Sequence, residues 1–128
     1  MTGFVTDVKE AARKNDYFRK VLFTAPKSQL VLMSIAPFEE IGIEVHDGDQ
    51  ILYVVEGEGE VVMEGSTKNI EKGTLIFVPA GVSHNVFNTD DEPLKLFTVY
   101  APPQHATGAV QRTREEAEHK KPAEVALR

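Results

Sequence analysis

The sequence contains no cysteine. Disulfides, thiolate metal sites and a cysteine nucleophile are therefore excluded, and folding does not require an oxidising compartment. No apolar run approaches the roughly 18 residues of a membrane span, and residues 1–16 lack the apolar stretch of a secretory signal. These absences predict a soluble, cytoplasmic protein without a membrane partner.

Basic residues are also few: 14 lysines and arginines stand against 20 acidic residues, and the net charge is −6. They are scattered along the chain, whereas nucleic-acid binding requires a basic face that neutralises phosphates. We therefore expect no nucleic-acid partner. The 128 residues suit a single domain with a hydrophobic core.

Short runs rich in β-branched, aromatic and other apolar residues fill the middle of the chain, with turn residues between them. The predicted strands are Phe18–Thr24, Gln29–Ala36, Ile41–Val45, Gln50–Glu56, Glu60–Glu64, Thr74–Val78, His84–Asn88 and Leu94–Ala101. Many short strands at near-regular spacing are typical of a β-sandwich or barrel. No long helix separates them, which disfavours a parallel α/β sheet. The pattern predicts an all-β fold.

Short helices are predicted at both ends, over residues 7–14 and 113–121. In each, a capping residue (Asp7 or Thr113) is followed three positions later by a glutamate, which is the pattern of a capping box. Pro122 ends the second helix because proline cannot continue it.

The predicted strand 94–101 shows two distinct faces. Lys95 marks one face as outward, so Leu94, Leu96, Thr98 and Tyr100 are expected to share the inward face. Thr98 and Tyr100 carry polar tips on this apolar face, as residues lining a ligand pocket do. A core strand whose tyrosine hydroxyl bonds to backbone is the alternative.

Three donor side chains gather around a turn. Glu44 and His46 are two residues apart on a predicted strand and therefore point to one face. Asp47-Gly48-Asp49 is a turn sequence, and Gln50 opens the next strand beside the end of the previous one. By itself this arrangement is also typical of a solvated strand end.

A second motif follows: residues 73–88 read G-x5-P-x-G-x2-H-x3-N, with the histidine at position 84. This segment resembles the second motif of the cupin family at every defining position. The family's first motif, G-x5-H-x-H-x3-4-E-x6-G, is matched in spacing by Glu44-x-His46-x3-Gln50-x6-Gly57, although Phe38 stands where its first glycine would be.

The resemblance covers about residues 29–103 and implies a double-stranded β-helix, the jelly-roll or cupin barrel. It also implies that Glu44, His46, Gln50 and His84 together hold one divalent metal ion. The segment Tyr100–His105 is similar to the tail of small cupins described as mannose-6-phosphate-isomerase-like. Cupins of this kind often pair through their sheets, so the resemblance further implies a homodimer.

The two departures from the family motif leave the ligand charge unchanged. Three neutral histidines and a carboxylate carry −1, and so do two neutral histidines, one carboxylate and one amide. A divalent ion would retain +1 and its ability to polarise an oxygen. The mixed nitrogen and oxygen donors fit Mn, Fe(II), Ni, Co or Zn.

Other polar residues near these motifs are weaker candidates. His105 follows a Pro-Pro pair, and we expect a loop histidine in solvent, with a place over the barrel mouth as the alternative. Asp49 is the nearest rival of Gln50 as a ligand, although its spacing fits the motif less well. His119 is expected on the surface of the second helix.

Four functions are compatible with these features. The first is a metal-dependent isomerase or lyase that acts on a small oxygenated substrate, such as a sugar acid or keto acid. The second is an Fe(II)-type dioxygenase, and the third is a non-catalytic module that binds a small molecule. The third stays open because no lysine or arginine is predicted inside the barrel. The fourth is a scaffold that only oligomerises.

Overall fold

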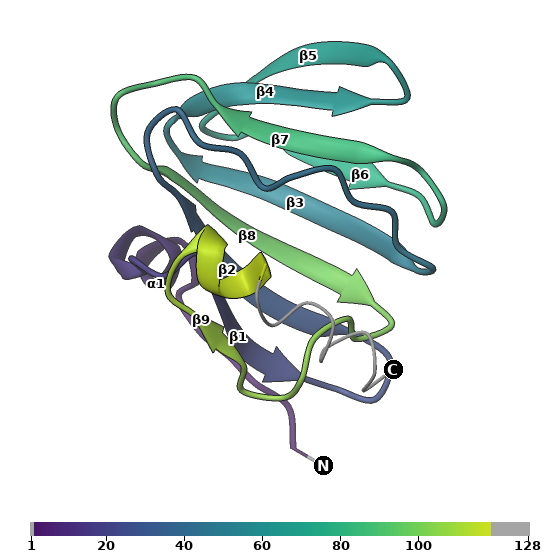
Figure 1. The fold of residues 1–128 in the computed structure, drawn as a ribbon. Coiled ribbons are helices and arrows are strands. Elements are labelled where there is room, and N and C mark those ends of the chain that lie inside the picture. Colours follow the sequence, from purple (N-terminus) through teal and green to yellow (C-terminus); the bar gives the residue numbers. More distant parts are fainter. Residues whose placement is uncertain (1, 119–128) are drawn as a thin grey trace.

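Two antiparallel sheets face each other in the computed structural model, which describes residues 2–118 (Figure 1). The larger sheet has the strand order β6-β3-β8-β2-β1-β9, and the smaller sheet has the order β5-β4-β7. The elements are α1 (Val8–Lys14), β1 (Arg19–Thr24), β2 (Gln29–Ile35), β3 (Asp49–Glu56), β4 (Glu58–Met63), β5 (Ser66–Glu71), β6 (Leu75–Val78), β7 (His84–Asn88), β8 (Leu94–Ala101) and β9 (Val110–Gln111). The predicted all-β jelly roll with short terminal helices is confirmed.

Segment 41–45, predicted as a strand, forms only one isolated bridge, between Glu44 and His84, and Glu40 just before the segment forms another with Phe87. Gly42 lies between these bridges with φ 106°. Because this conformation is outside the extended region, a continuous strand cannot run through it.

Two strands, β5 and β9, are not among those predicted from the sequence. Strand β5 reads Ser-Thr-Lys-Asn-Ile-Glu, and Ile70 is its only buried residue. It is an edge strand fixed by pairing with β4 along its whole length rather than by its own hydrophobicity. Strand β9 has only two residues, which is too short for alternation to be recognised.

The core lies between the two sheets. Leu94, Leu96, Thr98 and Tyr100 are all buried on the inward face of β8, as predicted. Lys95 lies on the opposite face, but the expectation that it reaches solvent is wrong. Its ammonium is buried beneath the end of α1, where it donates to the carbonyl of Asn15.

The two helix starts are capped as predicted. The carboxylate of Asp7 accepts a hydrogen bond from the backbone N–H of Glu10 at 3.2 Å, and the hydroxyl of Thr113 accepts one from that of Glu116 at 3.0 Å. Residues 114–118 are helical. The remainder of the predicted helix, with His119 and Pro122, lies outside the described residues.

Within residues 2–118, no helix is long and apolar enough to span a membrane.

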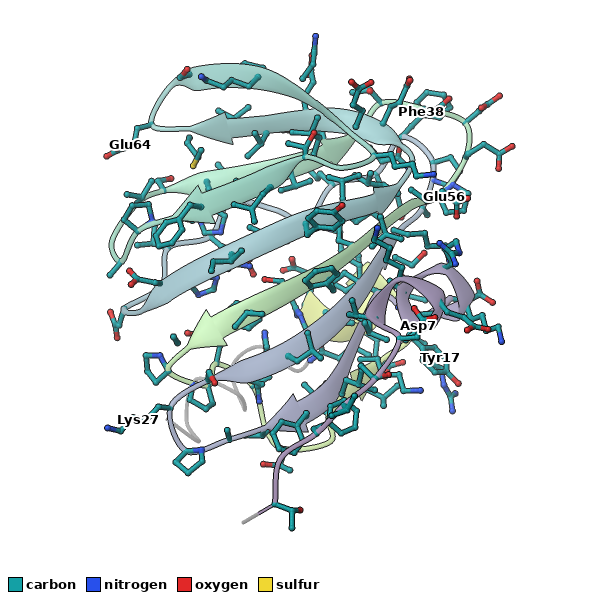
Figure 2. All side chains as sticks on the ribbon, turned by 180° about the vertical axis from the view of Figure 1, so that it is seen from behind. Asp7, Tyr17, Lys27, Phe38, Glu56 and Glu64 are labelled. Carbon is teal, nitrogen blue, oxygen red and sulfur yellow. The ribbon has the colours of Figure 1, made fainter. Side chains whose placement is uncertain are left out.

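In the described part of the chain, residues 2–118, two non-glycine residues adopt left-handed backbone conformations, and both are labelled in Figure 2. Glu64 (φ 46°) precedes Gly65 in the turn that joins β4 to β5. Phe38 (φ 61°) stands where the family motif has its first glycine, and 72% of it is exposed. The loop therefore keeps the backbone shape that glycine favours, at the cost of strain in phenylalanine.

The outer face of the larger sheet carries apolar side chains. Helix α1 covers one part of it, over Leu32 and Val55. Beyond the helix, Leu75 and Phe77 of β6 are 59% and 51% exposed. Their partners across β3 and β8 are Tyr53 and Phe97, and Ile51 and Val99. We call these six residues the outer apolar face.

Candidate metal centre

Backbone hydrogen bonds bring Glu44 and His84 together, although 40 positions separate them along the chain. The N–H of each donates to the carbonyl of the other, at 2.9 and 3.0 Å. Two residues after Glu44, the carbonyl of His46 accepts a hydrogen bond from the N–H of Gly81 at 2.8 Å. The loop of the first motif is thus attached to the turn that precedes β7.

The turn between His46 and Gln50 requires glycine. A Cβ atom at Gly48 would lie 2.3 Å from the carbonyl oxygen of Ala101 at the end of β8. Asp49 is exposed, and its carboxylate accepts a hydrogen bond from the N–H of Ala80 at 3.0 Å. Asp49 therefore fixes the turn and faces away from the ligand position that Gln50 occupies.

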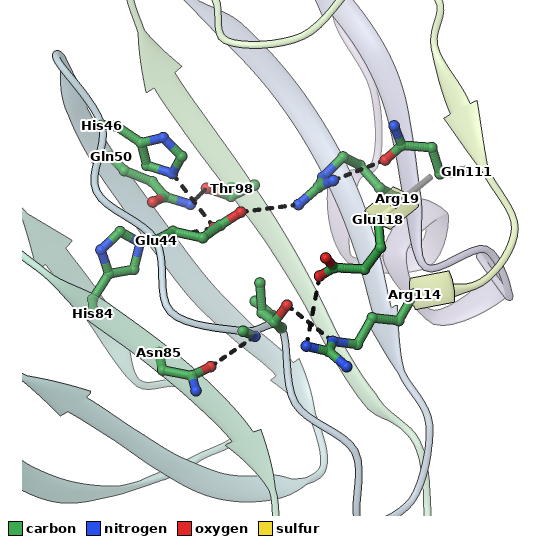
Figure 3. Close-up of polar contacts among 12 residues, drawn as sticks. Arg19, Glu44, His46, Gln50, His84, Asn85, Thr98, Gln111, Arg114 and Glu118 are labelled. Atoms are coloured by element: carbon green, nitrogen blue, oxygen red, sulfur yellow. Dashed lines mark hydrogen bonds and ion pairs between the residues drawn. The ribbon is translucent and has the colours of Figure 1, made fainter. Parts of the chain in front are cut away.

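The ligand atoms of Glu44, His46 and His84 lie within 4.8 Å of one another (Figure 3). Oε1 of Glu44 is 3.4 Å from Nε2 of His46 and 4.0 Å from Nε2 of His84. Ligand atoms bound about 2.1 Å from one ion stand roughly 3 to 4 Å apart. These three side chains can therefore hold a metal ion with only small movements.

Gln50 lies beside this cluster, and Thr98 sets the orientation of its amide (Figure 3). The Thr98 hydroxyl donates to the carbonyl of Ile51 at 2.8 Å, so it can only accept from Gln50. Nε2 of Gln50 donates to it at 3.1 Å. The amide oxygen of Gln50 has no hydrogen bond and points its lone pairs into the site, and it is the amide atom that binds metals.

His84 is held in its neutral form, with Nε2 available to bind a metal ion. Its Nδ1 lies 3.0 Å from the carbonyl of Val82, which places the proton on Nδ1 and the lone pair on Nε2. Burial lowers the pKa of His84 below its usual range, and this outweighs the opposing effects of the Val82 carbonyl and the Glu44 carboxylate. The imidazole is therefore uncharged at neutral pH.

Glu44 is held in its charged form. Burial acts most strongly on the carboxyl group and raises its pKa, but the contact with His46 and the charge of Arg19 outweigh burial, so that the pKa falls to about 2. Nη2 of Arg19 lies 3.5 Å from Oε2 of Glu44. The prediction that no arginine enters the barrel is therefore wrong.

Side-chain atoms at the centre of the cluster are buried without hydrogen bonds. Among the residues that the structure describes, no hydrogen-bond partner is found for either ring nitrogen of His46, for Oε1 of Gln50 or for Nε2 of His84. Buried polar groups are usually paired, because an unpaired one loses its hydration without compensation. A cation bound among these side chains would take one lone pair from each, namely from Nε2 of His46, Oε1 of Gln50 and Nε2 of His84, so the residues fit a divalent metal.

Tyr100 and His105 extend one wall of the site. The ring of Tyr100 meets that of His46 edge-on with centroids 5.4 Å apart, and His105 meets Tyr100 at 5.1 Å. His105 is 8% exposed, so the expectation of a solvent histidine is wrong. Gln29 holds its backbone, because the side chain of Gln29 accepts from the N–H of His105 and donates to its carbonyl.

Two further side chains hold the loop that carries Glu44. Oδ1 of Asn85 accepts from the N–H of Gly42 at 2.9 Å, and Nε of Arg114 donates to the carbonyl of Ile41 at 3.2 Å (Figure 3). Neither was identified from the sequence. Asn85 neighbours a predicted ligand, but only the fold places it opposite this loop.

The sequence of this chain is similar to those of known proteins. The sequence profile described as "Cupin domain" matches residues 31–100. The uncharacterised protein YrkC of Bacillus subtilis is 40% identical over 121 residues, and the match covers 89% of this chain and 65% of that protein. An uncharacterised protein of Acanthamoeba polyphaga mimivirus is 37% identical over 113 residues, which cover 84% of this chain and 70% of the relative. The chain thus spans about two-thirds of these relatives.

The fold agrees with a crystal structure of a Bacillus halodurans protein. The two superpose with a TM-score of 0.91 at 39% sequence identity, over 92% of this chain and 95% of the other.

Proposed function

The chain belongs to the cupin domain family, and on that premise we propose that Glu44, His46, Gln50 and His84 bind one divalent metal ion that acts on a small oxygenated substrate. The observation that supports this most is the set of buried, unpaired donor atoms on His46, Gln50 and His84 around the Glu44 carboxylate. The donor set suits Mn, Fe(II), Ni, Co or Zn.

The proposed chemistry is that of an isomerase or lyase. A divalent ion at this site supplies Lewis acidity, which polarises a carbonyl or hydroxyl oxygen of a bound sugar acid or keto acid. A crystal structure of a predicted oxalate decarboxylase from Thermotoga maritima supports chemistry of this class; it is 26% identical with a TM-score of 0.58, over 60% of this chain and 69% of the other.

The protein side chains have separate roles in this proposal. Glu44 contributes the negative charge, His84 is fixed in the tautomer that offers Nε2, and Thr98 turns the Gln50 oxygen toward the site. Tyr100 lies next to His46 and His105 lies next to Tyr100, so both side chains would contact the substrate. The edge-on packing of Tyr100 also limits rotation of the His46 ring.

Elemental analysis tests the proposed site. Wild-type protein, purified without a chelator or a metal-affinity step, is expected to contain about one equivalent of a transition metal. The double variant His46→Ala with His84→Ala is expected to contain almost none. Glu58→Gln, which changes an exposed glutamate, serves as the control and should retain the metal. Equally negligible metal in wild type and double variant would reject the proposal.

We also propose that two copies of the chain pair through the outer apolar face. The exposed Leu75 and Phe77, at 59% and 51%, support this, because large exposed apolar side chains that cluster on a sheet commonly mark an interface. Light scattering after size exclusion is expected to report twice the mass of 14.2 kDa.

A further inference from the structure

Arg19 is a buried cation inside the barrel. It begins β1, is 4% exposed and shares the inward face with its cross-strand partner Met33. Nη1 donates to Oε1 of Gln111 at 2.8 Å, and the guanidinium lies 5.1 Å from the centre of the Phe18 ring. Its Nε has no hydrogen-bond partner among residues 2–118. Removing a guanidinium from water is costly unless opposite charge compensates for it.

The compensating charge is Glu44, and the two oxygens of this carboxylate face different groups (Figure 3). Oε2 lies 3.5 Å from Nη2 of Arg19, whereas Oε1 lies 3.4 Å from Nε2 of His46 and 4.0 Å from Nε2 of His84. Arg19 thus occupies one oxygen and leaves the other for the metal. This arrangement favours a carboxylate that binds the ion through one oxygen.

The pairing also changes the charge of the site. The four proposed ligands carry −1 when both histidines are neutral, and the guanidinium adds +1. The protein therefore contributes no net charge, and a divalent ion bound there would keep its full +2 instead of the +1 that the ligands alone would leave. A bound substrate would meet this larger positive charge in a buried setting, where screening is weak.

We propose that Arg19 makes the metal site select anionic chelators, namely a carboxylate with a neighbouring carboxylate, hydroxyl or carbonyl oxygen, over neutral ones of similar shape. The inference rests on the proposed function and narrows its substrate class. Arg19 is a positioning residue in this account, because it acts through Glu44 and through the field at the metal.

Cobalt(II) and three small two-oxygen ligands test the inference without requiring turnover. Oxalate, glycolate and glycolamide carry two, one and no negative charges. Calorimetry gives the dissociation constant of cobalt(II) for the metal-free protein and then that of each ligand for the cobalt-loaded protein. The variants are Arg19→Gln, Arg19→Lys, which keeps the charge, and Arg13→Gln, which removes an arginine exposed on α1.

Replacing Arg19 by glutamine is expected to change the affinities for the metal ion and for anionic ligands in opposite directions. Arg19→Gln should bind cobalt(II) at least as tightly as wild type, because a neighbouring cation is gone. It should bind oxalate at least about tenfold more weakly, glycolate about threefold more weakly, and glycolamide within about twofold of wild type. For Arg19→Lys and Arg13→Gln, the affinities for cobalt(II) and for all three ligands should stay within about threefold of the wild-type values. General damage to the site would instead weaken metal and all ligands together.

Several results would overturn the inference. If Arg19→Gln lost the same affinity for all three ligands, or bound oxalate as tightly as wild type, Arg19 would not be the cause of a preference for anionic ligands. Absence of cobalt(II) binding by wild type would reject the proposed function as well, so the two failures are distinguishable. If Arg19→Gln does not fold, wild type alone still decides. Its ratio of oxalate to glycolamide affinity should stay within about tenfold of the ratio for aqueous cobalt(II), and a ratio more than about tenfold smaller contradicts the inference.

Discussion

Replacing Glu44 by glutamine removes the charged oxygen donor of the site, and in metal-free protein the effect on stability is expected to depend on pH. The pKa of Glu44 falls from 4.5 to about 2 in the folded protein, because His46 and Arg19 outweigh burial. A carboxyl whose pKa is lower in the folded state stabilises the fold when ionised. Its contribution is fully present above about pH 4.5 and disappears as pH falls through about 2. The difference between the two values corresponds to about 3 kcal/mol.

Urea unfolding at a series of pH values measures this contribution. The protein has no tryptophan, so far-ultraviolet circular dichroism in the presence of a chelator is the suitable signal. At pH 7 Glu44→Gln should be less stable than wild type, since Arg19 then lacks its counter-charge. Between pH 5 and pH 3 the difference in unfolding free energy should shrink by about 2 kcal/mol. The exposed-site control Glu58→Gln should follow the wild-type curve. Parallel pH curves for wild type and Glu44→Gln would refute the electrostatic account of this buried carboxylate.

Three other substitutions test separate parts of the structure. Thr98→Val should lower metal affinity by about tenfold, because the Gln50 amide loses the acceptor that orients it; titration with cobalt(II) measures this, and the exposed Thr67→Val should change nothing. Phe77→Glu should convert the proposed dimer to a monomer in light scattering, and a dimer that persists would exclude the outer apolar face; Val5→Glu, at a residue 98% exposed and outside that face, is the control. Phe38→Gly should raise the unfolding free energy by roughly 0.5–1 kcal/mol, because relief of the left-handed strain exceeds the entropy cost of glycine. Thermal unfolding measures that change, and a loss of stability would show that the phenylalanine contributes more through its contacts than it costs.

Much of the fold could be predicted from the sequence, because its strands alternate and glycines punctuate them. The inward face of β8 follows directly from the spacing of Leu94, Leu96, Thr98 and Tyr100. Strand β5 could not be found this way, since its residues are mostly exposed and its partner strand determines its conformation. The same limit applies to segment 41–45, where Gly42 prevents a continuous strand although the predicted neighbours Glu44 and His46 still converge.

The charged environment of the site could not be predicted from the sequence. In β1 each face carries one basic residue and apolar neighbours, with Arg19 and Val21 on one face and Lys20 and Leu22 on the other. The alternation of side chains along β1 therefore does not decide whether Arg19 or Lys20 points into the barrel. The contacts of Arg19 with Gln111 and Glu44 decide it. His105 was misplaced for a similar reason, since its polar, proline-rich loop suggests exposure while distant Gln29 binds its backbone.

A crystal structure of cobalt-loaded protein, with anomalous diffraction at the cobalt edge, would locate the metal ion. We expect one anomalous peak about 2.0–2.3 Å from Nε2 of His46 and of His84, from Oε1 of Glu44 and from Oε1 of Gln50. Oε2 of Glu44 should remain in contact with Arg19. A peak elsewhere on the molecule, or clear density for water alone among these four side chains at saturating cobalt, would contradict the proposed metal site.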